Sequence, residues 1–330
     1  MSKVCRLALA VSLLTAILVC GLLLAGCSSN GNDLVFQSVS ERCSWSSLAR
    51  IAFASFSPNG MRYINSVNES GKSLQVVTPS DNDADLNDEG GYHPCYSPDG
   101  LYIYFASRRD TGGGAPSVDI FRADASNGAN LVQLTGGPTD VPGQTADDSM
   151  PYLAANGSKL CWISNRNGNI PHVWMMNPDG SAKVQVTTDN AREEAWPQFS
   201  PLADYIVYES RPVGTENSDL RVRVVAAAVD HNLAGANTAS REEQPAWSPT
   251  GDVLLFTSDR GGDFDIHATT LTFPGGVPTA SAPTQLTADA RSDGFPNWKP
   301  DATQFVFTRD REVWTANADG TNQEQLTRRN

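Results

Sequence analysis

Residues 94–100, Pro-Cys-Tyr-Ser-Pro-Asp-Gly, indicate the fold most clearly, because they begin a sequence repeat that recurs along the chain. A β run at 102–107, a polar loop, a second β run at 119–123 and a closing Leu134-Thr135 follow it. Proline presets φ for a turn, and glycine accepts the positive φ of a tight hairpin. The repeat therefore predicts two hairpin-linked strands, followed by further short strands.

Six copies of this repeat align on their first short strand. These strands are Cys43-Ser44-Trp45, Pro94-Cys95-Tyr96, Pro151-Tyr152-Leu153, Pro197-Gln198-Phe199, Pro245-Ala246-Trp247 and Pro296-Asn297-Trp298. A period of roughly 40–55 residues with four short strands is typical of a β-propeller, because one four-stranded sheet cannot bury both faces alone. We therefore predict an all-β fold, a six-bladed β-propeller of four-stranded antiparallel blades. The aromatic residues at the third position are expected to pack between blades.

The first and fourth copies of the repeat differ from the others, and arginines recur in most copies. A second turn signal at Ser57–Gly60 leaves the first blade ambiguous, but the spacing to later copies favours a start near Glu41, with Ser57–Gly60 as a hairpin loop. The fourth copy has no clear Leu-Thr, and an Ala/Asn-rich run at 226–239 takes its place. Arginines that recur after the second strands, together with the recurring aspartates of the third strands, are expected to form polar clamps across the loop between these strands and so to stabilise the fold.

The first residues predict export and lipidation. Lys3 and Arg6 precede an apolar run, and Leu-Ala-Gly at 24–26 stands directly before Cys27. A charged start, an apolar middle and a small-residue cleavage site are typical of a secretory signal, and the cysteine resembles a bacterial lipobox. An uncleaved transmembrane helix is the alternative. We predict a signal peptide at 1–26, lipidation of Cys27, a tether with a possible closing strand at 27–40, and a propeller at 41–330.

The repeat resembles that of TolB-type, WD-like propellers across about residues 41–327. TolB proteins are periplasmic members of the Tol–Pal envelope system, so the resemblance implies an envelope protein that binds other proteins. The same unit is similar to propellers beside prolyl oligopeptidase domains and to some sugar-processing propellers. An enzyme acting on an extracellular polymer, with His93 and nearby carboxylates as its site at the channel mouth, is therefore the alternative function.

Acidic residues precede the first strands. The most regular four stand three residues before a proline, and the set that we predict to bind a partner or cation is Asp148, Glu194, Glu242, Asp293, Glu89, Glu41 and the nearby His93. A ring of carboxylates at one channel mouth would attract a basic peptide, a small cationic ligand or a divalent cation. The alternative is a solvated loop with weak local ion pairs. We expect amide substitutions in the ring to leave the fold intact.

The net charge limits the class of partner, and the cysteine count limits the disulfides that can form. The net charge is −13, and removal of residues 1–26 with Lys3 and Arg6 takes it to −15. Such an acidic chain repels phosphate backbones, which excludes nucleic acid as the expected partner. Cys43, Cys95 and Cys161 are expected to be buried free thiols, with one disulfide and a spare thiol as the alternative. We expect a monomer on the membrane of the cell envelope, facing the periplasm or the cell surface.

Overall fold

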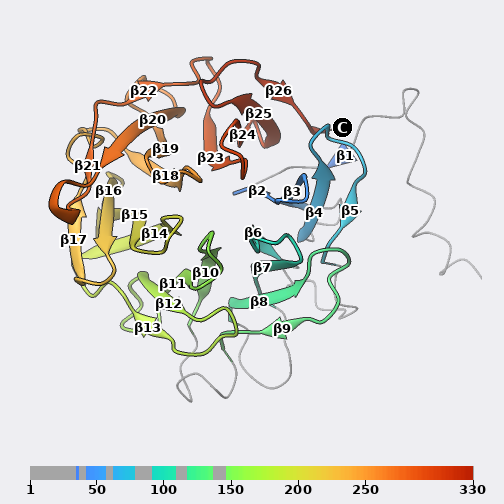
Figure 1. Ribbon diagram of the computed structural model, residues 1–330, viewed down its shortest axis with the longest axis horizontal. Helices are drawn as coiled ribbons and strands as arrows, with labels where there is room; N and C mark the ends of the chain where they lie inside the picture. Colours follow the sequence, from blue (N-terminus) through green and yellow to red (C-terminus); the bar gives the residue numbers. More distant parts are fainter. Residues whose placement is uncertain are drawn as a thin grey trace, which may run out of the picture. The chain divides into compact units, whose positions relative to one another are not determined.

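The computed structural model describes residues 35–36, 42–56, 62–78, 91–108, 117–136 and 146–329. The unit from Leu34 to Asn330 is a ring of six antiparallel sheets around a central axis (Figure 1). In the described residues the helical structure is one short turn, η2 (Pro274–Gly276). The predicted six-bladed all-β propeller is confirmed.

Each blade runs from the axis outwards in chain order. Blade 1 contains β2 (Ser44–Trp45), β3 (Arg50–Phe56), β4 (Arg62–Asn68) and β5 (Gln75–Val76). Blade 2 contains β6 (Tyr92–Tyr96), β7 (Tyr102–Ser107), β8 (Asp119–Asp124) and β9 (Val132–Gln133). Blade 3 contains β10 (Asp148–Leu153), β11 (Leu160–Ser164), β12 (His172–Met176) and β13 (Val184–Gln185).

The second half repeats this order. Blade 4 contains β14 (Arg192–Phe199), β15 (Tyr205–Pro212), β16 (Asp219–Val224) and β17 (Val229–Asn232). Blade 5 contains β18 (Glu242–Trp247), β19 (Val253–Ser258) and β20 (Asp265–Thr272), and both β21 (Thr279–Ala280) and β22 (Thr284–Gln285) pair with β20. Blade 6 contains β23 (Asp293–Trp298), β24 (Gln304–Arg309), β25 (Glu312–Asn317) and β26 (Glu324–Gln325).

Blade 1 begins with β2, as the spacing to the later copies of the repeat predicted. β2 pairs with β3, and β3 pairs with β4 on either side of the Ser57–Gly60 turn signal. That turn therefore lies within the hairpin of blade 1, and the alternative start at Ile51 is wrong. The residues of the turn itself lie outside the described part of the chain.

The core lies between neighbouring blades. One buried cluster joins Trp45 and Phe53 of blade 1 to Val306 of blade 6, and another joins Val207 of blade 4 to Trp247 of blade 5. Each sheet thus buries both faces against its neighbours, which an isolated blade could not do. The aromatic residues of the third position pack here as expected.

The Leu-Thr ending fixes the outer strand to the third strand. In five blades the threonine hydroxyl accepts the backbone N–H at the start of the third strand at 2.9 Å: Thr78 from Ile64, Thr135 from Ile120, Thr187 from Val173, Thr287 from Ile266 and Thr327 from Val313. In blade 4, Asn237 Oδ1 accepts from Leu220 N at 2.9 Å. The Ala/Asn-rich run therefore replaces the missing threonine with an asparagine.

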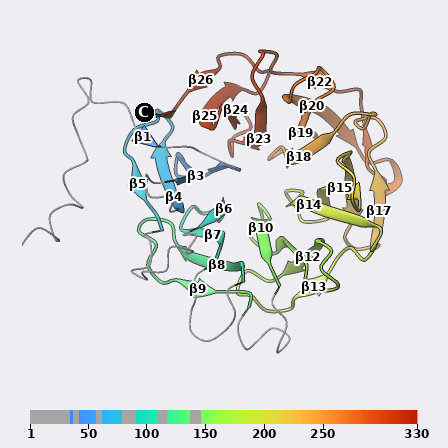
Figure 2. The same ribbon diagram turned by 180° about the vertical axis from the view of Figure 1, so that it is seen from behind.

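The two ends of the propeller pair with each other. β1 (Val35–Phe36) pairs in parallel with β27 (Arg328–Arg329), which directly follows the last outer strand. Both ribbon views place the C-terminus beside β1 (Figures 1 and 2). The sequence predicted a closing strand in this stretch, and the pairing found forms a separate two-stranded sheet rather than a fifth strand of the blade.

Candidate functional site

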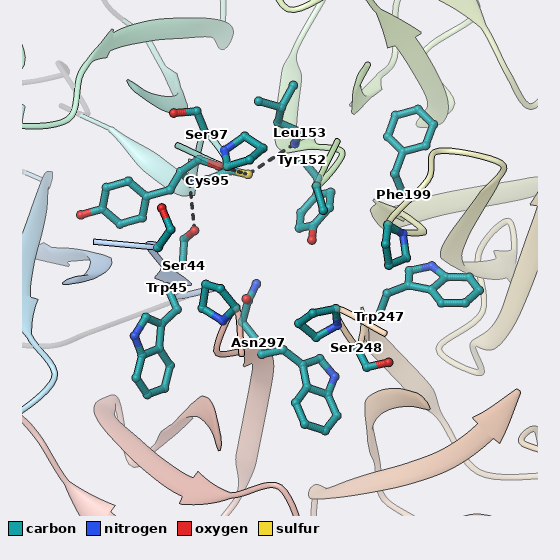
Figure 3. Close-up of a pocket in the computed structure, with 18 residues that line it drawn as sticks. Ser44, Trp45, Cys95, Ser97, Tyr152, Leu153, Phe199, Trp247, Ser248 and Asn297 are labelled. Atoms are coloured by element: carbon teal, nitrogen blue, oxygen red, sulfur yellow. Dashed lines mark hydrogen bonds between the residues drawn. The ribbon is translucent and has the colours of Figure 1, made fainter. Parts of the chain in front are cut away.

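A cavity of about 360 Å³ lies on the channel axis at the end where the Ser-Pro turns stand. All six blades line it through the last residues of their innermost strands and the turns that follow, as Figure 3 shows. The lining residues are Ser44, Trp45, Ser47, Cys95, Tyr96, Ser97, Pro98, Tyr152, Leu153, Ala155, Phe199, Pro201, Trp247, Ser248, Pro249, Asn297, Trp298 and Pro300. Volumes of this order are common for small-ligand sites.

Alternation along the innermost strands decides which side chains enter the cavity. Second-position side chains face the channel, and Figure 3 shows the Tyr152 phenol and the Asn297 amide pointing towards its middle. Third-position rings such as Trp45 and Trp247 extend away from the centre between the blades. The cavity is therefore walled by aromatic and prolyl groups, with a few hydroxyl and amide groups and no Asp, Glu, Lys or Arg.

The second-position side chains also join consecutive blades. Ser44 Oγ accepts from Tyr96 N at 3.0 Å, and Cys95 Sγ accepts from Leu153 N at 3.4 Å. Gln198 accepts from Trp247 N in the same way. Cys43, Cys95 and Cys161 are all buried and free, which confirms the preferred interpretation of the cysteines.

A layer of side chains closes the channel above the cavity. The residue before each inner-strand proline has positive φ in five blades: His93 at 54°, Met150 at 57°, Trp196 at 49°, Gln244 at 54° and Phe295 at 54°. In each of these blades the ladder with the second strand shifts register at this point. Such a bulge re-aims a side chain, and bulky residues adopt positive φ only where surrounding contacts enforce it.

Ring contacts show that these side chains meet at the axis. His93 of blade 2 lies 4.8 Å from Trp196 of blade 4, and Trp196 lies 4.9 Å from Phe295 of blade 6, both as ring-centroid distances. These blades are not neighbours, so their side chains can touch only across the channel. We call this layer, with Arg42 at the same offset in blade 1, the axial plug.

Hydrogen bonds link the plug from blade to blade. His93 Nδ1 accepts from Met150 N at 3.2 Å, Met150 Sδ accepts from Trp196 N at 3.3 Å, and Gln244 Oε1 accepts from Phe295 N at 2.7 Å. Because Nδ1 accepts, the ring proton of neutral His93 lies on Nε2. Burial, reinforced by Arg42 and Arg62, holds the pKa of His93 well below its usual range. His93 is therefore a neutral packing residue of the plug, not a member of an acidic mouth.

The four regular carboxylates are buried, not exposed. Their relative exposures are 1% for Asp148, 4% for Glu194, 0% for Glu242 and 1% for Asp293. Three pair with an arginine at or just after the end of the second strand of the same blade: Asp148 with Arg166 at 2.7 Å, Glu242 with Arg260 at 3.0 Å and Asp293 with Arg309 at 2.5 Å. Arginine clamps therefore exist in these blades, but their partners are the carboxylates assigned to the ring, whereas the predicted clamps used the aspartates of the third strands.

Blade 4 uses a different partner for its carboxylate. Glu194 Oε2 lies 2.7 Å from Nδ1 of His172, which belongs to blade 3, and it accepts from the Thr187 hydroxyl at 3.0 Å. Burial raises the pKa of Glu194, and the contacts with His172 and Thr187 oppose that shift. Arg211, near the end of the second strand β15, pairs instead with Glu193 at 2.9 Å.

The expectation of an exposed acidic ring is thus corrected: a carboxylate at this offset completes a clamp because the blade interior can accept it only with a cationic or hydrogen-bonding partner. Binding of a basic partner or divalent cation by these groups stays a prediction. Glu41, Glu89 and Cys27 lie outside the described residues. Within the described ranges no three His, Cys, Asp or Glu side chains are grouped to hold a metal ion.

Sequence reasoning missed two buried charged groups. Arg42 is 3% exposed, and Glu209 on β15 is 6% exposed with no hydrogen-bond partner at Oε2. Burial and the neighbouring Glu243 raise the pKa of Glu209 to about 8. The alignment of the first strands contained a signal for Arg42, since it stands at the offset of His93. No repeat signal identified Glu209, because the same strand position in other blades is not acidic.

Comparisons with known proteins agree with this architecture. No model of a known protein family matches the chain. An uncharacterized protein of Agrobacterium fabrum is 29% identical over 214 residues, which cover 61% of this chain and 67% of that protein. A solved structure of a TolB candidate from Agrobacterium tumefaciens has a TM-score of 0.59 at 18% identity, covering 77% of this chain and 84% of the other.

Other solved structures are similar over comparable lengths. TolB from Acinetobacter baumannii has a TM-score of 0.53 at 16% identity, covering 76% of this chain and 57% of that protein. This chain has the TolB-type propeller fold. The tricorn protease also matches, with a TM-score of 0.61 at 14% identity over 89% of this chain and 26% of the protease. At these identities the likeness concerns the fold, which peptidase-associated propellers share.

Proposed function

We propose that this chain is a lipid-anchored scaffold of the cell envelope that binds a protein or a smaller ligand at the Ser-Pro-turn end of its channel. The observation that carries the proposal is the cavity itself, to which all six blades contribute and which the axial plug closes from the other side. Loops on one face of a rigid ring are the usual binding surface of a propeller.

The location is part of the same proposal. The lipobox-like sequence before Cys27 supports anchorage at a membrane, and Ser28 after it lacks the acidic residue that retains many lipoproteins at an inner membrane. In a cell with two membranes we therefore assign the chain to the outer one. Among the described residues no helix is long and apolar enough to cross a membrane.

The enzyme alternative receives no support from the residues named for it. His93 accepts a backbone N–H inside the plug, and the carboxylates nearest in sequence pattern are held by Arg166, Arg260 and Arg309. A general acid or base must reach substrate within hydrogen-bond distance. These side chains are instead committed to contacts inside the blades.

A rim substitution tests the proposal. Ala155 is exposed and lines the cavity, so Ala155→Trp should obstruct it without disturbing the core. Ala227, exposed beside the outer strand of blade 4, gives a matched control with the same substitution. Cross-linking in the native envelope fraction should capture one partner with the wild type and with Ala227→Trp, but not with Ala155→Trp. Equal capture by all three would refute binding at this end.

A further inference from the structure

Tyr152 and Asn297 line the cavity but lack the hydrogen bonds that their counterparts make. At the second position of the innermost strands, Ser44, Cys95 and Gln198 accept a backbone N–H of the next blade. Tyr152 of blade 3 and Asn297 of blade 6 occupy the same position. Within the described ranges, neither the phenol oxygen of Tyr152 nor the amide of Asn297 has a hydrogen-bond partner. The contacts between blades therefore leave these two polar groups unused.

The two side chains face each other across the channel. Blades 3 and 6 are opposite in a ring of six, and Figure 3 shows the Tyr152 phenol and the Asn297 amide pointing towards the middle of the cavity from opposite sides. Both residues line the cavity, so a ligand there can contact them directly. Asn297 is only 8% exposed, and a buried amide normally has a partner because its burial without one is costly. The Asn297 amide therefore marks a position for a polar group of a ligand.

The polar group that fits this position carries no charge. The lining contains no Asp, Glu, Lys or Arg, so a charged group would lose its hydration without gaining an ion pair. Burial raises the pKa of the Tyr152 phenol, which therefore stays protonated and can donate its O–H. The guanidinium carbon of Arg42 lies 5.6 Å from the centroid of the Tyr152 ring, and this contact holds the ring in place.

The Asn297 amide selects among uncharged groups by geometry. Its carbonyl oxygen accepts while its adjacent NH₂ donates, so the best complement offers a donor and an acceptor on one edge. A primary carboxamide and a cis lactam have such an edge, whereas a trans peptide group directs its N–H and C=O to opposite sides. The carbonyl oxygen of the ligand has a second lone pair, which can accept the O–H of Tyr152 from the opposite wall.

We infer that the cavity binds an uncharged carboxamide or lactam group between Asn297 and Tyr152, with the apolar part of the ligand against prolyl turns such as those of Pro98 and Pro249. This inference rests on the proposed function and deepens it, because it names the chemistry bound at the same cavity. Two sources can supply such a group: a free small amide, or the side chain of a glutamine or asparagine on a protein loop.

Ligand-detected NMR titrations of the full chain in detergent separate these sources. The probes are benzamide and the peptide acetyl-Ala-Gln-Ala-N-methylamide, each beside its carboxylate counterpart, benzoate or the Glu peptide. At least one amide should bind, and its carboxylate should bind roughly tenfold more weakly or worse, because it lacks the donor and buries an unpaired charge. Tighter binding of the Gln peptide indicates a protein side chain, and binding of benzamide alone indicates a small amide.

Variants assign the selectivity to the two side chains. The wild type should prefer benzamide to the cation benzamidine, and Asn297→Asp should reverse this preference, because a carboxylate pairs with an amidinium through two charge-assisted hydrogen bonds. Tyr152→Phe keeps the ring, removes the O–H and should weaken benzamide binding several-fold; it tests the same site if Asn297→Asp does not fold. Asn167→Asp, on an exposed asparagine after the second strand of blade 3, is the matched control and should leave the preference unchanged.

Absence of binding by both amides, equal binding of their carboxylates, or full benzamide affinity in Tyr152→Phe would overturn the inference, as would an unchanged preference in a folded Asn297→Asp variant. None of these results depends on the natural partner. If both amides fail while partner capture still depends on the cavity rim, the inference is wrong and the proposed function stands. If benzamide binds through Asn297 but Ala155→Trp still captures the partner, the proposed function is wrong and the amide site stands.

Discussion

At the scale of single residues, composition and spacing located the carboxylates correctly but did not reveal their environment. Asp148 and Arg166 were both visible as repeated features, one before the first strand and one after the second. Their pairing depends on how the two strands lie in register, with Asp148 opposite Ser164. A sequence pattern shows that a charge recurs, but only the fold shows whether it faces solvent or another strand.

The buried pair makes Asp148→Asn destabilising, contrary to the expectation for an exposed ring. Removing one partner of a buried ion pair costs roughly 3–5 kcal/mol, because the other charge stays buried without compensation. Denaturant unfolding measures the change. Asp310→Asn is the control: Asp310 is exposed and lies 3.9 Å from Arg291, so its loss should cost less than about 1 kcal/mol. Equal, small effects of both substitutions would contradict the structural role.

Glu209 should make the protein less stable as pH rises. Its pKa is raised from 4.5 to about 8 in the folded state by burial and by Glu243, so the folded protein holds a proton that the unfolded chain has lost between these values. Stability should fall across this window by at most about 1.4 kcal/mol per pH unit. Thermal melts from pH 5 to pH 9 should show this decline in the wild type and a flatter profile in Glu209→Gln. Parallel profiles would refute the assignment.

At the scale of strands, turn chemistry and the β runs were predictable because their determinants are local. The Ser-Pro turns and the hairpin of blade 1 follow directly from residue preferences and spacing. The positive φ at Met150, Trp196 and Phe295 was not predictable, since none of these residue types favours it. The bulge is imposed by the ring, in which every blade must aim a side chain at a shared axis. The axial plug, and hence the closed end of the cavity, was therefore invisible in the sequence.

The Leu-Thr ending should stabilise each blade through its hydroxyl. Thr135 is fully buried and accepts from Ile120 N at 2.9 Å, so Thr135→Val keeps the shape but leaves that N–H unpaired. The expected loss is roughly 1–3 kcal/mol in the free energy of unfolding. Thr135→Ser retains the acceptor and should lose less. A valine variant as stable as the serine variant would show that packing, not the hydrogen bond, explains the repeat.

At the scale of the whole molecule, the number of blades followed from counting repeats, whereas the binding end of the channel did not. Both ends are built from loops, and the sequence drew attention to the more charged one. The structure shows that the carboxylates three residues before the inner-strand prolines are buried in the blades. At the other end it shows a cavity lined by no charged side chain and formed by the Ser-Pro turns. Repeats specify the ring, but the cavity depends on differences between copies, such as Tyr152 and Asn297.

Lipidation should place the whole molecule at a membrane. Mass analysis of the purified N-terminus should find Cys27 as the first residue, carrying a diacyl group and a further acyl chain, because more than one chain is needed for lasting anchorage. Cys27→Ser should release the protein into the soluble fraction. An intact Met1, or an unmodified Cys27 at the N-terminus, would exclude this anchor.

Hydrogen–deuterium exchange on the partner-bound protein tests most directly whether binding occurs at the cavity end of the channel. Binding there should give new protection in the turns after the innermost strands, such as residues 97–101, 154–158 and 248–252, and little change in the segments that lead into those strands. Protection concentrated instead at residues 188–192, 238–241 and 289–292, the side on which the acidic residues precede the strands, would contradict it.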